Sequence, residues 1–405
     1  MITGLLAISI FTVMFSMVAK RLSSTIVTAP MLFIGFGVLI AELGLLPIDH
    51  MEETLHLVAE IALIILLFLD AAQTDLNALR KRFVWPFRML VIGLPLAMIL
   101  GTAAAWLFLP AWPLAALALL AAILAPTDAA LGQAVVTNPV VPERVRRALT
   151  VESGLNDGLA LPAILLFASL TAISTHHDET NWLVFGAKQL ILGPLVGIVV
   201  GSIGGKVLLW VKKNQYTSDI YEGVGALALA CSCYLAAGLI GGNGFIAAFV
   251  AGLFFGGIVK DHCKFIFEFT ESEGQGLIWG AFLLIGMVLV PEALPHLDST
   301  ALAIILTSLF IIRPLAIWVS LSGTDAMPLT KLFFGWFGPR GLATALFALT
   351  VVHEIGLELG EAILHLAVNA VWISALLHGV TATPAAKWYA RKIDQQGKCA
   401  ETLAE

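Results

Sequence analysis

The sequence predicts an all-α, polytopic membrane protein with about thirteen transmembrane helices, arranged as inverted repeats that contain two broken helices. Composition is the first observation behind this prediction: of 405 residues, 59% are hydrophobic and only 12% are charged, whereas soluble domains contain about 25% charged residues. The second is the grouping of the apolar residues into runs of about 20, the length that spans a bilayer as a helix. The third is the position of the basic residues, which alternates along the chain.

Thirteen apolar runs follow one another. They lie near residues 3–19, 29–46, 54–73, 84–109, 112–136, 147–171, 182–211, 220–240, 243–259, 275–292, 299–322, 332–352 and 361–386. Polar or basic loops separate most of them, but only Gly241 and Gly242 separate the eighth run from the ninth. The first run has no basic segment before it and no small-residue cleavage site after it, so we expect a retained span rather than a signal peptide.

The basic residues predict the orientation of the chain. Of the 22 Lys and Arg residues, all but Lys188, Arg313 and Arg340 lie in loops that follow odd-numbered runs, at the adjoining ends of those runs, or in the C-terminal segment. Loops that follow even-numbered runs contain none. By the positive-inside rule, we expect the odd loops and the C-terminus in the cytoplasm and the N-terminus outside.

Two of the runs are interrupted in a similar way. The fifth run contains Pro-Thr-Asp (126–128), and the twelfth contains Gly-Pro-Arg-Gly (338–341). Proline removes a backbone donor and clashes with the preceding turn, so both helices are predicted to break. The interruptions are seven runs apart, an odd number, so repeats that contain them would be inverted in the membrane. A pair of such breaks is the best sequence pointer to the binding site of a transporter.

The segment Glu-Ser-Gly-Leu-Asn-Asp-Gly (152–158) places two carboxylates in an apolar run. Ionisable groups at membrane depth cost about 2.5–3.5 kcal/mol on insertion scales and mark functional sites. At about 100° per residue, Ser153 and Asp157 share one face of a helix and Glu152 and Asn156 share another, with about 140° between the two carboxylates. The carboxylates therefore meet different surroundings, and we expect them to have different roles.

Acidic residues outnumber the available arginines. Four acids, Asp70, Asp128, Glu152 and Asp157, stand against two arginines that lie well inside the runs, Arg313 and Arg340. If all four acids are buried, at least one needs a proton or a mobile cation, because burial disfavours an unpaired charge. Which arginine pairs with which acid stays open at this point. Carboxylates, the hydroxyls of Thr127 and Ser153, and carbonyls freed at Pro126 suit Na⁺, Li⁺ or K⁺ better than a soft metal.

These motifs resemble the cation/proton antiporters, in the branch of NhaP and the eukaryotic sodium/hydrogen exchangers. The three segments at 126–128, 152–158 and 338–341 occur in the family's order and on the matching spans, and the segments at 241–252 and 68–71 add weaker support. The resemblance covers essentially the whole membrane region. It implies the NhaA-like antiporter fold, in which the two broken helices cross.

The same resemblance implies two moving parts and a homodimer. A core formed by spans near 84–171 and 299–386 is expected to move against a dimerisation domain formed by spans near 1–73 and 182–292. Together they make one transport unit, 1–386, which is followed by a short cytoplasmic tail, 387–405.

By this resemblance, Asp157 is the carboxylate that binds both the cation and the proton. The residues implied to complete or shape its site are Thr127, Asp128, Ser153 and Asn156, while Asp70 matches an acidic position that faces the ion route. Glu152 is implied to pair with Arg313, and Arg340 to lie where the broken helices cross. One departure is Ala129, where many relatives have proline, and it leaves the local backbone and the ion preference open.

The expected function is electroneutral Na⁺/H⁺ antiport by alternating access in a bacterial-type inner membrane. A K⁺/H⁺ antiporter with the same site is the alternative, and a cation channel is a weaker one. An intramembrane enzyme is disfavoured because no G-x-S-x-G or H-E-x-x-H motif occurs. The four cysteines show no disulfide or zinc spacing. The expected partners are a monovalent cation, a proton, membrane lipid and a second copy of the chain, with no resident cofactor and no nucleic acid.

Overall fold

The computed structural model describes residues 2–22, 25–46, 51–74, 84–175, 182–260, 262–352, 355–397 and 399–402. All regular secondary structure within these ranges is helical. Each of the thirteen predicted runs coincides with one helix or with consecutive helices, so the predicted fold class is confirmed. Some basic residues behind the predicted orientation lie outside the described residues, namely Arg80, Lys81, Arg82 and Lys398.

The helices follow the order of the runs. Those of the first six runs are α1 (Ile2–Leu22), α2 (Ala29–Glu42), α3 (Met51–Gln73), α5 (Val84–Arg88) with α6 (Leu94–Phe108), α7 (Leu114–Ile123) with α8 (Ala129–Val136), and α9 (Glu143–Thr175). Those of the last seven are α10 (Trp182–Lys213), α11 (Asp219–Leu239), α12 (Gly244–Val259), α13 (Lys264–Leu284) with α14 (Val290–Ala293), α15 (Ser299–Thr307) with α16 (Arg313–Ser320), α17 (Pro328–Trp336) with α18 (Leu342–Val351), and α19 (Leu357–Asp394).

Two kinds of interruption occur in these helices. Single π-helical turns connect α5 to α6, α13 to α14 and α15 to α16, so each of these pairs stays continuous. Residues 124–128 and 337–341, in contrast, are not helical, and they separate α7 from α8 and α17 from α18. These are the two breaks that the proline-containing segments predict.

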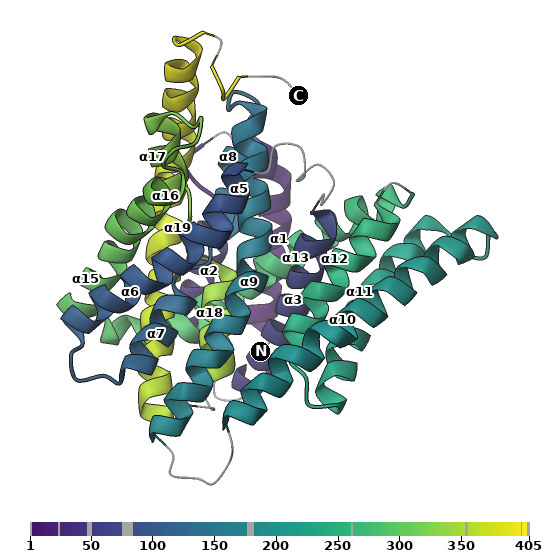
Figure 1. Cartoon of the computed structure of the whole chain (residues 1–405), viewed down its shortest axis with the longest axis horizontal. Coiled ribbons are helices and arrows are strands. Elements are labelled where there is room, and N and C mark those ends of the chain that lie inside the picture. Colours follow the sequence, from purple (N-terminus) through teal and green to yellow (C-terminus); the bar gives the residue numbers. More distant parts are fainter. Residues whose placement is uncertain are drawn as a thin grey trace.

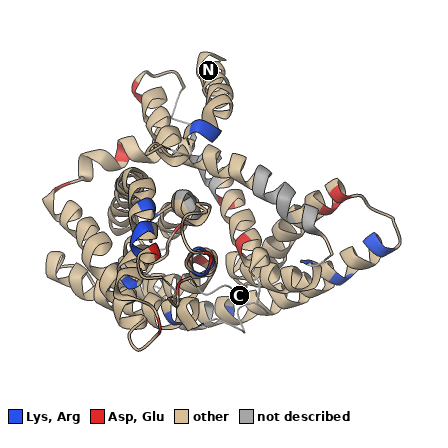
Figure 2. Ribbon diagram, turned by 90° about the horizontal axis from the view of Figure 1, so that it is seen from above, with Lys and Arg blue, Asp and Glu red and all other residues tan. Residues whose placement is uncertain are grey.

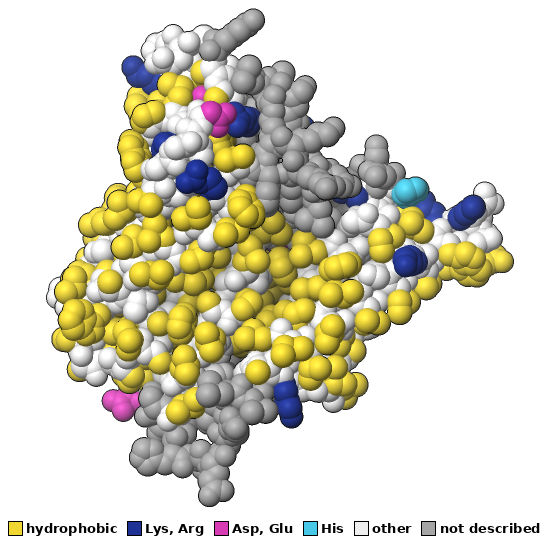
Figure 3. Space-filling view, viewed as in Figure 1, with side chains coloured by type: hydrophobic (Ala, Val, Ile, Leu, Met, Phe, Trp, Pro, Cys, Tyr) yellow, Lys and Arg dark blue, Asp and Glu magenta, His cyan; other side chains and the backbone are white. Residues whose placement is uncertain are grey.

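The helices have the length and surface of membrane spans. Eight helical segments of the described chain are long and apolar enough to cross a membrane, and α2, α7, α12 and α18 are shorter apolar helices. Hydrophobic side chains form a broad band across the middle of the molecule in the space-filling view, and most of the charged side chains in this view lie above or below it (Figure 3). Helices satisfy their own backbone hydrogen bonds and can therefore be exposed to lipid. The chain is a multi-pass membrane protein.

The helices form two groups, and in Figure 1 α6, α7 and α15–α17 lie on one side of α9 while α3 and α10–α13 lie on the other. In one group, α7 packs against α6 and α9, α16 packs against α17, and α19 packs against α8 and α18. In the other, α12 packs against α3, α10 and α11, while α2 packs against α13. Seen from above, the N-terminal helix lies at the edge of the molecule and the C-terminal end lies within its outline (Figure 2).

Small residues allow α12 to pack closely between α3 and α10. A Cβ atom added to Gly256 would lie 2.1 Å from the carbonyl oxygen of Ala72 on α3, and one added to Gly201 would lie 2.4 Å from that of Ala251 on α12. Close approach of backbones is how helices associate in lipid, where burial of apolar surface gives no driving force between them. The second group therefore has a tightly packed centre.

The segment that follows α19 packs against the start of α17. The basic residues predict that this end of the molecule faces the cytoplasm. Glu401 is 1% exposed, and its Oε1 accepts hydrogen bonds from the backbone N–H of Met327 at 2.9 Å and from the Thr330 hydroxyl at 2.7 Å. Since Met327 precedes α17 and offers no side-chain cap, Glu401 satisfies donors at the start of this helix. No sequence pattern signals this contact, because the two segments are far apart in the chain.

Arg144 and Asp325 hold the same region together. Arg144 donates to both oxygens of Asp325 at 2.8 and 3.2 Å, and it also donates to the carbonyl of Ala400 at 2.9 Å. Its guanidinium carbon lies 3.8 Å from the ring centre of Trp85, whose indole N–H donates to Asp325. Burial alone would raise the pKa of Asp325, but the hydrogen bonds from Arg144 and Trp85 outweigh it and hold that pKa below its usual value.

Candidate cation-binding site

The two breaks meet each other in the middle of the first helix group. The backbone N–H of Asp128 donates to the carbonyl of Pro339 at 2.9 Å. In the other direction, Asp128 Oδ2 accepts from the backbone N–H of Leu342 at 2.7 Å. Leu342 is the first residue of α18, so the Asp128 carboxylate caps that helix and meets the positive end of its dipole.

Two glycines of the second break make this contact possible. A Cβ atom at Gly341 would lie 1.8 Å from Asp128 Oδ2, and a Cβ atom at Gly338 would lie 1.6 Å from Arg313 Nε. Neither distance is compatible with a side chain, so both positions need glycine for close approach.

We expect Gly341→Ala to destabilise the crossing and to impair transport, because Asp128 would have to leave its position at the start of α18. Loss of a cap costs about 0.5–2 kcal/mol, and overpacking adds about 1–3 kcal/mol. Thermal unfolding in detergent measures the effect. Gly280→Ala is the matched control, because nothing lies within 4 Å of its added Cβ atom. Equal melting temperatures for the two variants would contradict the prediction.

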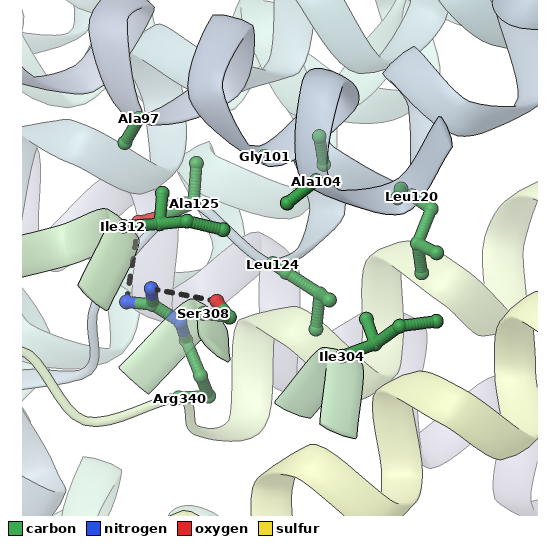
Figure 4. A pocket seen from close by; sticks show the side chains of 12 residues that line it. Ala97, Gly101, Ala104, Leu120, Leu124, Ala125, Ile304, Ser308, Ile312 and Arg340 are labelled. Carbon is green, nitrogen blue, oxygen red and sulfur yellow. Dashed lines mark hydrogen bonds between the residues drawn. The ribbon is translucent and has the colours of Figure 1, made fainter. Parts of the chain in front are cut away.

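Arg340 supports the breaks and not a carboxylate. It is 1% exposed, and Nη1 donates to the carbonyls of Ala125 and Pro126 at 3.4 Å and of Gly338 at 3.0 Å. Its Nη2 donates to the Ser308 hydroxyl at 3.3 Å. Figure 4 shows the guanidinium directed towards Ser308 and Ala125, which line a small cavity together with Arg340. Arg340 therefore pairs with carbonyls that the helix breaks leave without intrahelical donors.

A relay of hydrogen bonds from α19 fixes the other side of Arg340. Its backbone N–H donates to the Ser374 hydroxyl at 2.7 Å, which lies 3.1 Å from His378 Nδ1, and His378 Nε2 lies 2.8 Å from the carbonyl of Trp336. His378 Nδ1 also lies 2.9 Å from the carbonyl of Ser374, so both ring nitrogens face backbone carbonyls, and a neutral imidazole can donate to only one of them. Sequence reasoning missed Ser374 and His378. The available signal was a histidine within an apolar run, which is an ionisable group at membrane depth.

Glu152 forms a buried ion pair with Arg313. Arg313 donates from Nη1 to Oε1 at 2.9 Å and from Nη2 to Oε2 at 3.0 Å, and the side chains are 5% and 2% exposed for Arg313 and Glu152. Such two-pronged pairs are among the strongest charge-assisted hydrogen bonds. This geometry shows that Arg313, and not Arg340, faces Glu152. The residues of the sequence alone left this choice open.

Thr127 and Asn156 connect this ion pair to the first break. The Thr127 hydroxyl lies 3.3 Å from Glu152 Oε2 and 3.4 Å from the Ser153 hydroxyl. Asn156 Nδ2 donates to the Thr127 hydroxyl at 2.5 Å and to Glu152 Oε1 at 3.4 Å. The amide oxygen of Asn156 is buried and has no hydrogen-bond partner among the described residues. An oxygen in this situation is available to a cation.

Asp157 stands outside this network although it is only 6% exposed. Its carboxylate forms no hydrogen bond or ion pair with any part of the chain that the structure describes. A buried carboxylate is costly unless it is paired, so Asp157 requires either a proton or a cation. Of the predicted site residues, the structure therefore brings Thr127, Glu152, Ser153, Asn156 and Arg313 into one network and leaves Asp157 unpaired beside it.

Asp70 lies next to this site on α3. A Cβ atom at Gly154 of α9 would lie 3.6 Å from the carbonyl oxygen of Asp70 and 3.8 Å from its Cβ atom. The half-buried carboxylate of Asp70 has no ion-pair partner within the described ranges. The residue is close to the network but does not belong to it.

Comparison with known proteins gives the family. The family model described as sodium/hydrogen exchanger, transmembrane, matches residues 6–388. The chain belongs to this family of membrane transport proteins.

Relatives with similar sequences include the K⁺/H⁺ antiporter NhaP2 of Shewanella sp. (strain ANA-3), which is 30% identical over 388 residues, or 93% of this chain and 64% of the relative. The K⁺/H⁺ antiporter NhaP of Alkalimonas amylolytica is 29% identical over 400 residues, or 96% of this chain and 67% of the relative. The chain thus spans 64% of the length of the Shewanella relative.

A solved structure shares the fold. The sodium proton antiporter MjNhaP1 from Methanocaldococcus jannaschii, determined at pH 8, superposes with a TM-score of 0.79 at 21% sequence identity, covering 98% of this chain and 99% of that chain. The two chains therefore share one fold, which in this protein contains the two crossing breaks.

Proposed function

We propose that this protein exchanges a monovalent cation for a proton across the membrane, and that both bind in turn at Asp157. The observation that carries the proposal is the contrast between two buried carboxylates on one helix. Arg313 neutralises Glu152, whereas no described residue neutralises Asp157. Only Asp157 therefore needs a mobile positive charge.

The chemistry of exchange follows from this contrast. With a proton bound, Asp157 is neutral and can be exposed to either side without a cation. With the proton released, the carboxylate and the unpartnered amide oxygen of Asn156 attract a desolvated cation, and the hydroxyls of Thr127 and Ser153 lie nearby. Glu152 stays ionised throughout because Arg313 holds both of its oxygens. One proton is then exchanged for one cation, and no net charge moves.

The cation is proposed to be Na⁺, with K⁺ as the second candidate. Oxygen ligands suit both ions. The relatives in Shewanella and Alkalimonas are named as K⁺/H⁺ antiporters, while the solved structure with the same fold is a sodium proton antiporter. These names support both candidates, so the choice belongs to the experiment.

The two helix groups are proposed to be the moving parts. The group with α5–α9 and α15–α19 carries Asp157 and would form the core, and the group with α1–α3 and α10–α14 would hold a second copy of the chain in a homodimer. The basic residues support a C-terminus in the cytoplasm, and the bacterial relatives support a bacterial-type inner membrane.

Proton flux in sealed proteoliposomes tests the function. We expect Na⁺, Li⁺ or K⁺, supplied separately, to drive proton movement with an optimum at intermediate pH, since protons displace the cation at low pH and no proton returns at high pH. Clamping the membrane potential with K⁺ and valinomycin should leave the initial Na⁺-driven rate unchanged. A rate that changes with voltage would indicate a second titrating group, with Asp128 as the first residue to examine. Cation flux without any proton movement would indicate a channel.

A further inference from the structure

A cavity of about 620 Å³ lies between the two helix groups. Its walls come from α9 and α18 on one side and from α3, α10, α11 and α12 on the other. Most of the lining is apolar, including Leu63, Leu161, Ile164, Phe245 and Phe347. The cavity lies beside the middle of α9 and the C-terminal half of α18.

The polar groups of the cavity are few. Glu60 on α3 is its one carboxylate, and the Tyr234 hydroxyl of α11 donates a hydrogen bond to Glu60 Oε1. On the opposite part of the wall, Asn243 Nδ2 donates to Gln189 Oε1 at 3.3 Å, and Asn243 Oδ1 accepts from the backbone N–H of Ile246 at 2.9 Å. The oxygens of both amides are therefore occupied, whereas the charge in the cavity belongs to Glu60.

An apolar barrier separates the cavity from Asp157. Leu161, which lines the cavity, lies one helical turn after Asp157 on the same face of α9. Phe249 of α12 packs directly on Gly158, since a Cβ atom there would lie 2.2 Å from its ring. The ring is 5% exposed. Because Gly158 has no side chain, the Phe249 ring of one helix group can pack against α9 of the other group, next to Asp157.

We propose that this cavity is a vestibule on the route to Asp157, and that Glu60 is the carboxylate that first binds the monovalent cation within it. The proposal rests on the proposed function and deepens it. A cation that has left bulk water gains little from the apolar walls, so it collects at the single negative charge. Because the walls exclude water and focus the field, one carboxylate raises the local cation concentration more here than on an open surface. The phenolic oxygen of Tyr234 is a second hard ligand at the same place.

The charge of the vestibule can be measured without transport. Thr350 lines the cavity, so Thr350→Cys, in a protein whose four native cysteines are replaced by alanine, reports its potential through the rates of reaction with a cationic and an anionic thiosulfonate reagent. We expect Glu60→Gln to lower the ratio of the cationic to the anionic rate about three- to tenfold, as one nearby unit charge does at intermediate dielectric. Tyr234→Phe keeps the carboxylate and should keep the ratio.

Glu42→Gln is the matched control, because it removes an exposed carboxylate at the end of α2 that does not line the cavity. An unchanged ratio in Glu60→Gln, an equal fall in Glu42→Gln, or no reaction at Thr350→Cys would each overturn the proposal.

In proteoliposomes, Glu60→Gln should raise the apparent KM for the cation about threefold or more from the side of the cavity, with little change in maximal rate. An unchanged KM from that side would also count against it. Absence of exchange by the wild-type protein would reject the proposed function, while the labelling ratio would still decide whether Glu60 attracts cations.

Discussion

Replacing Asp157 by Asn is expected to abolish cation-driven proton flux while the protein still folds. The substitution keeps the volume of the side chain but removes the exchangeable proton and the charge that binds the cation. Asp157 makes no hydrogen bond or ion pair with the described residues, so its loss removes no stabilising contact. We therefore expect a melting temperature in detergent equal to or above that of the wild-type protein, because an unpaired buried charge is itself destabilising.

The measurement is Na⁺-, Li⁺- and K⁺-driven proton flux in proteoliposomes that contain equal amounts of inserted protein. Asp394→Asn serves as the control, since it makes the same chemical change at an exposed position near the end of α19 and should retain full flux. Substantial exchange by a well-inserted Asp157→Asn protein would reject the assignment of this carboxylate. Asp128 could take over the role of Asp157 only if its carboxylate lost the hydrogen bond from the backbone N–H of Leu342.

The membrane fold could be predicted from the sequence because lipid imposes a simple rule on it. A span needs about 20 apolar residues, and each of the runs satisfies this rule, including the pair separated only by Gly241 and Gly242. The breaks were also predictable, since Pro126 and Pro339 interrupt otherwise apolar runs. Each π-helical turn also ends just before a proline, namely Pro95, Pro291 or Pro314, but proline alone does not distinguish such a turn from a complete break.

The partners within the site were harder to predict. Composition and spacing place two arginines in the membrane, but they do not show that Arg313 reaches Glu152 whereas Arg340 reaches carbonyls. That difference depends on Gly338, whose missing side chain leaves the space that Arg313 Nε occupies. Contacts between distant segments, such as that of Glu401 with the start of α17, depend on the tertiary fold and leave no periodic pattern.

Glu152→Gln is expected to lower the stability of the folded protein more than any other single carboxylate substitution at the site. It leaves Arg313 buried without its counter-charge, at a cost of about 3–5 kcal/mol, and it weakens the contacts with Thr127 and Asn156. In thermal unfolding in detergent, Glu152→Gln should therefore melt well below both the wild-type protein and Asp157→Asn. A melting temperature equal to that of the wild-type protein would contradict the role of the pair.

A double-mutant cycle separates the pair from its surroundings. Arg313→Met should destabilise the protein to a similar extent as Glu152→Gln, because each leaves one buried charge uncompensated. The double variant removes both charges, and replacement of a buried ion pair by uncharged groups is often nearly neutral. We therefore expect the double variant to be more stable than either single variant, with a coupling energy of about 0.5–3 kcal/mol. Arg340→Ala should show a much smaller coupling to Glu152→Gln, because its hydrogen bonds are with backbone carbonyls and Ser308, and Glu152 acts on it only at a distance. Coupling of Glu152 to Arg340 in place of Arg313 would mean that the ion pair exchanges partners in the membrane, and Glu152 would then no longer be a fixed charge during transport.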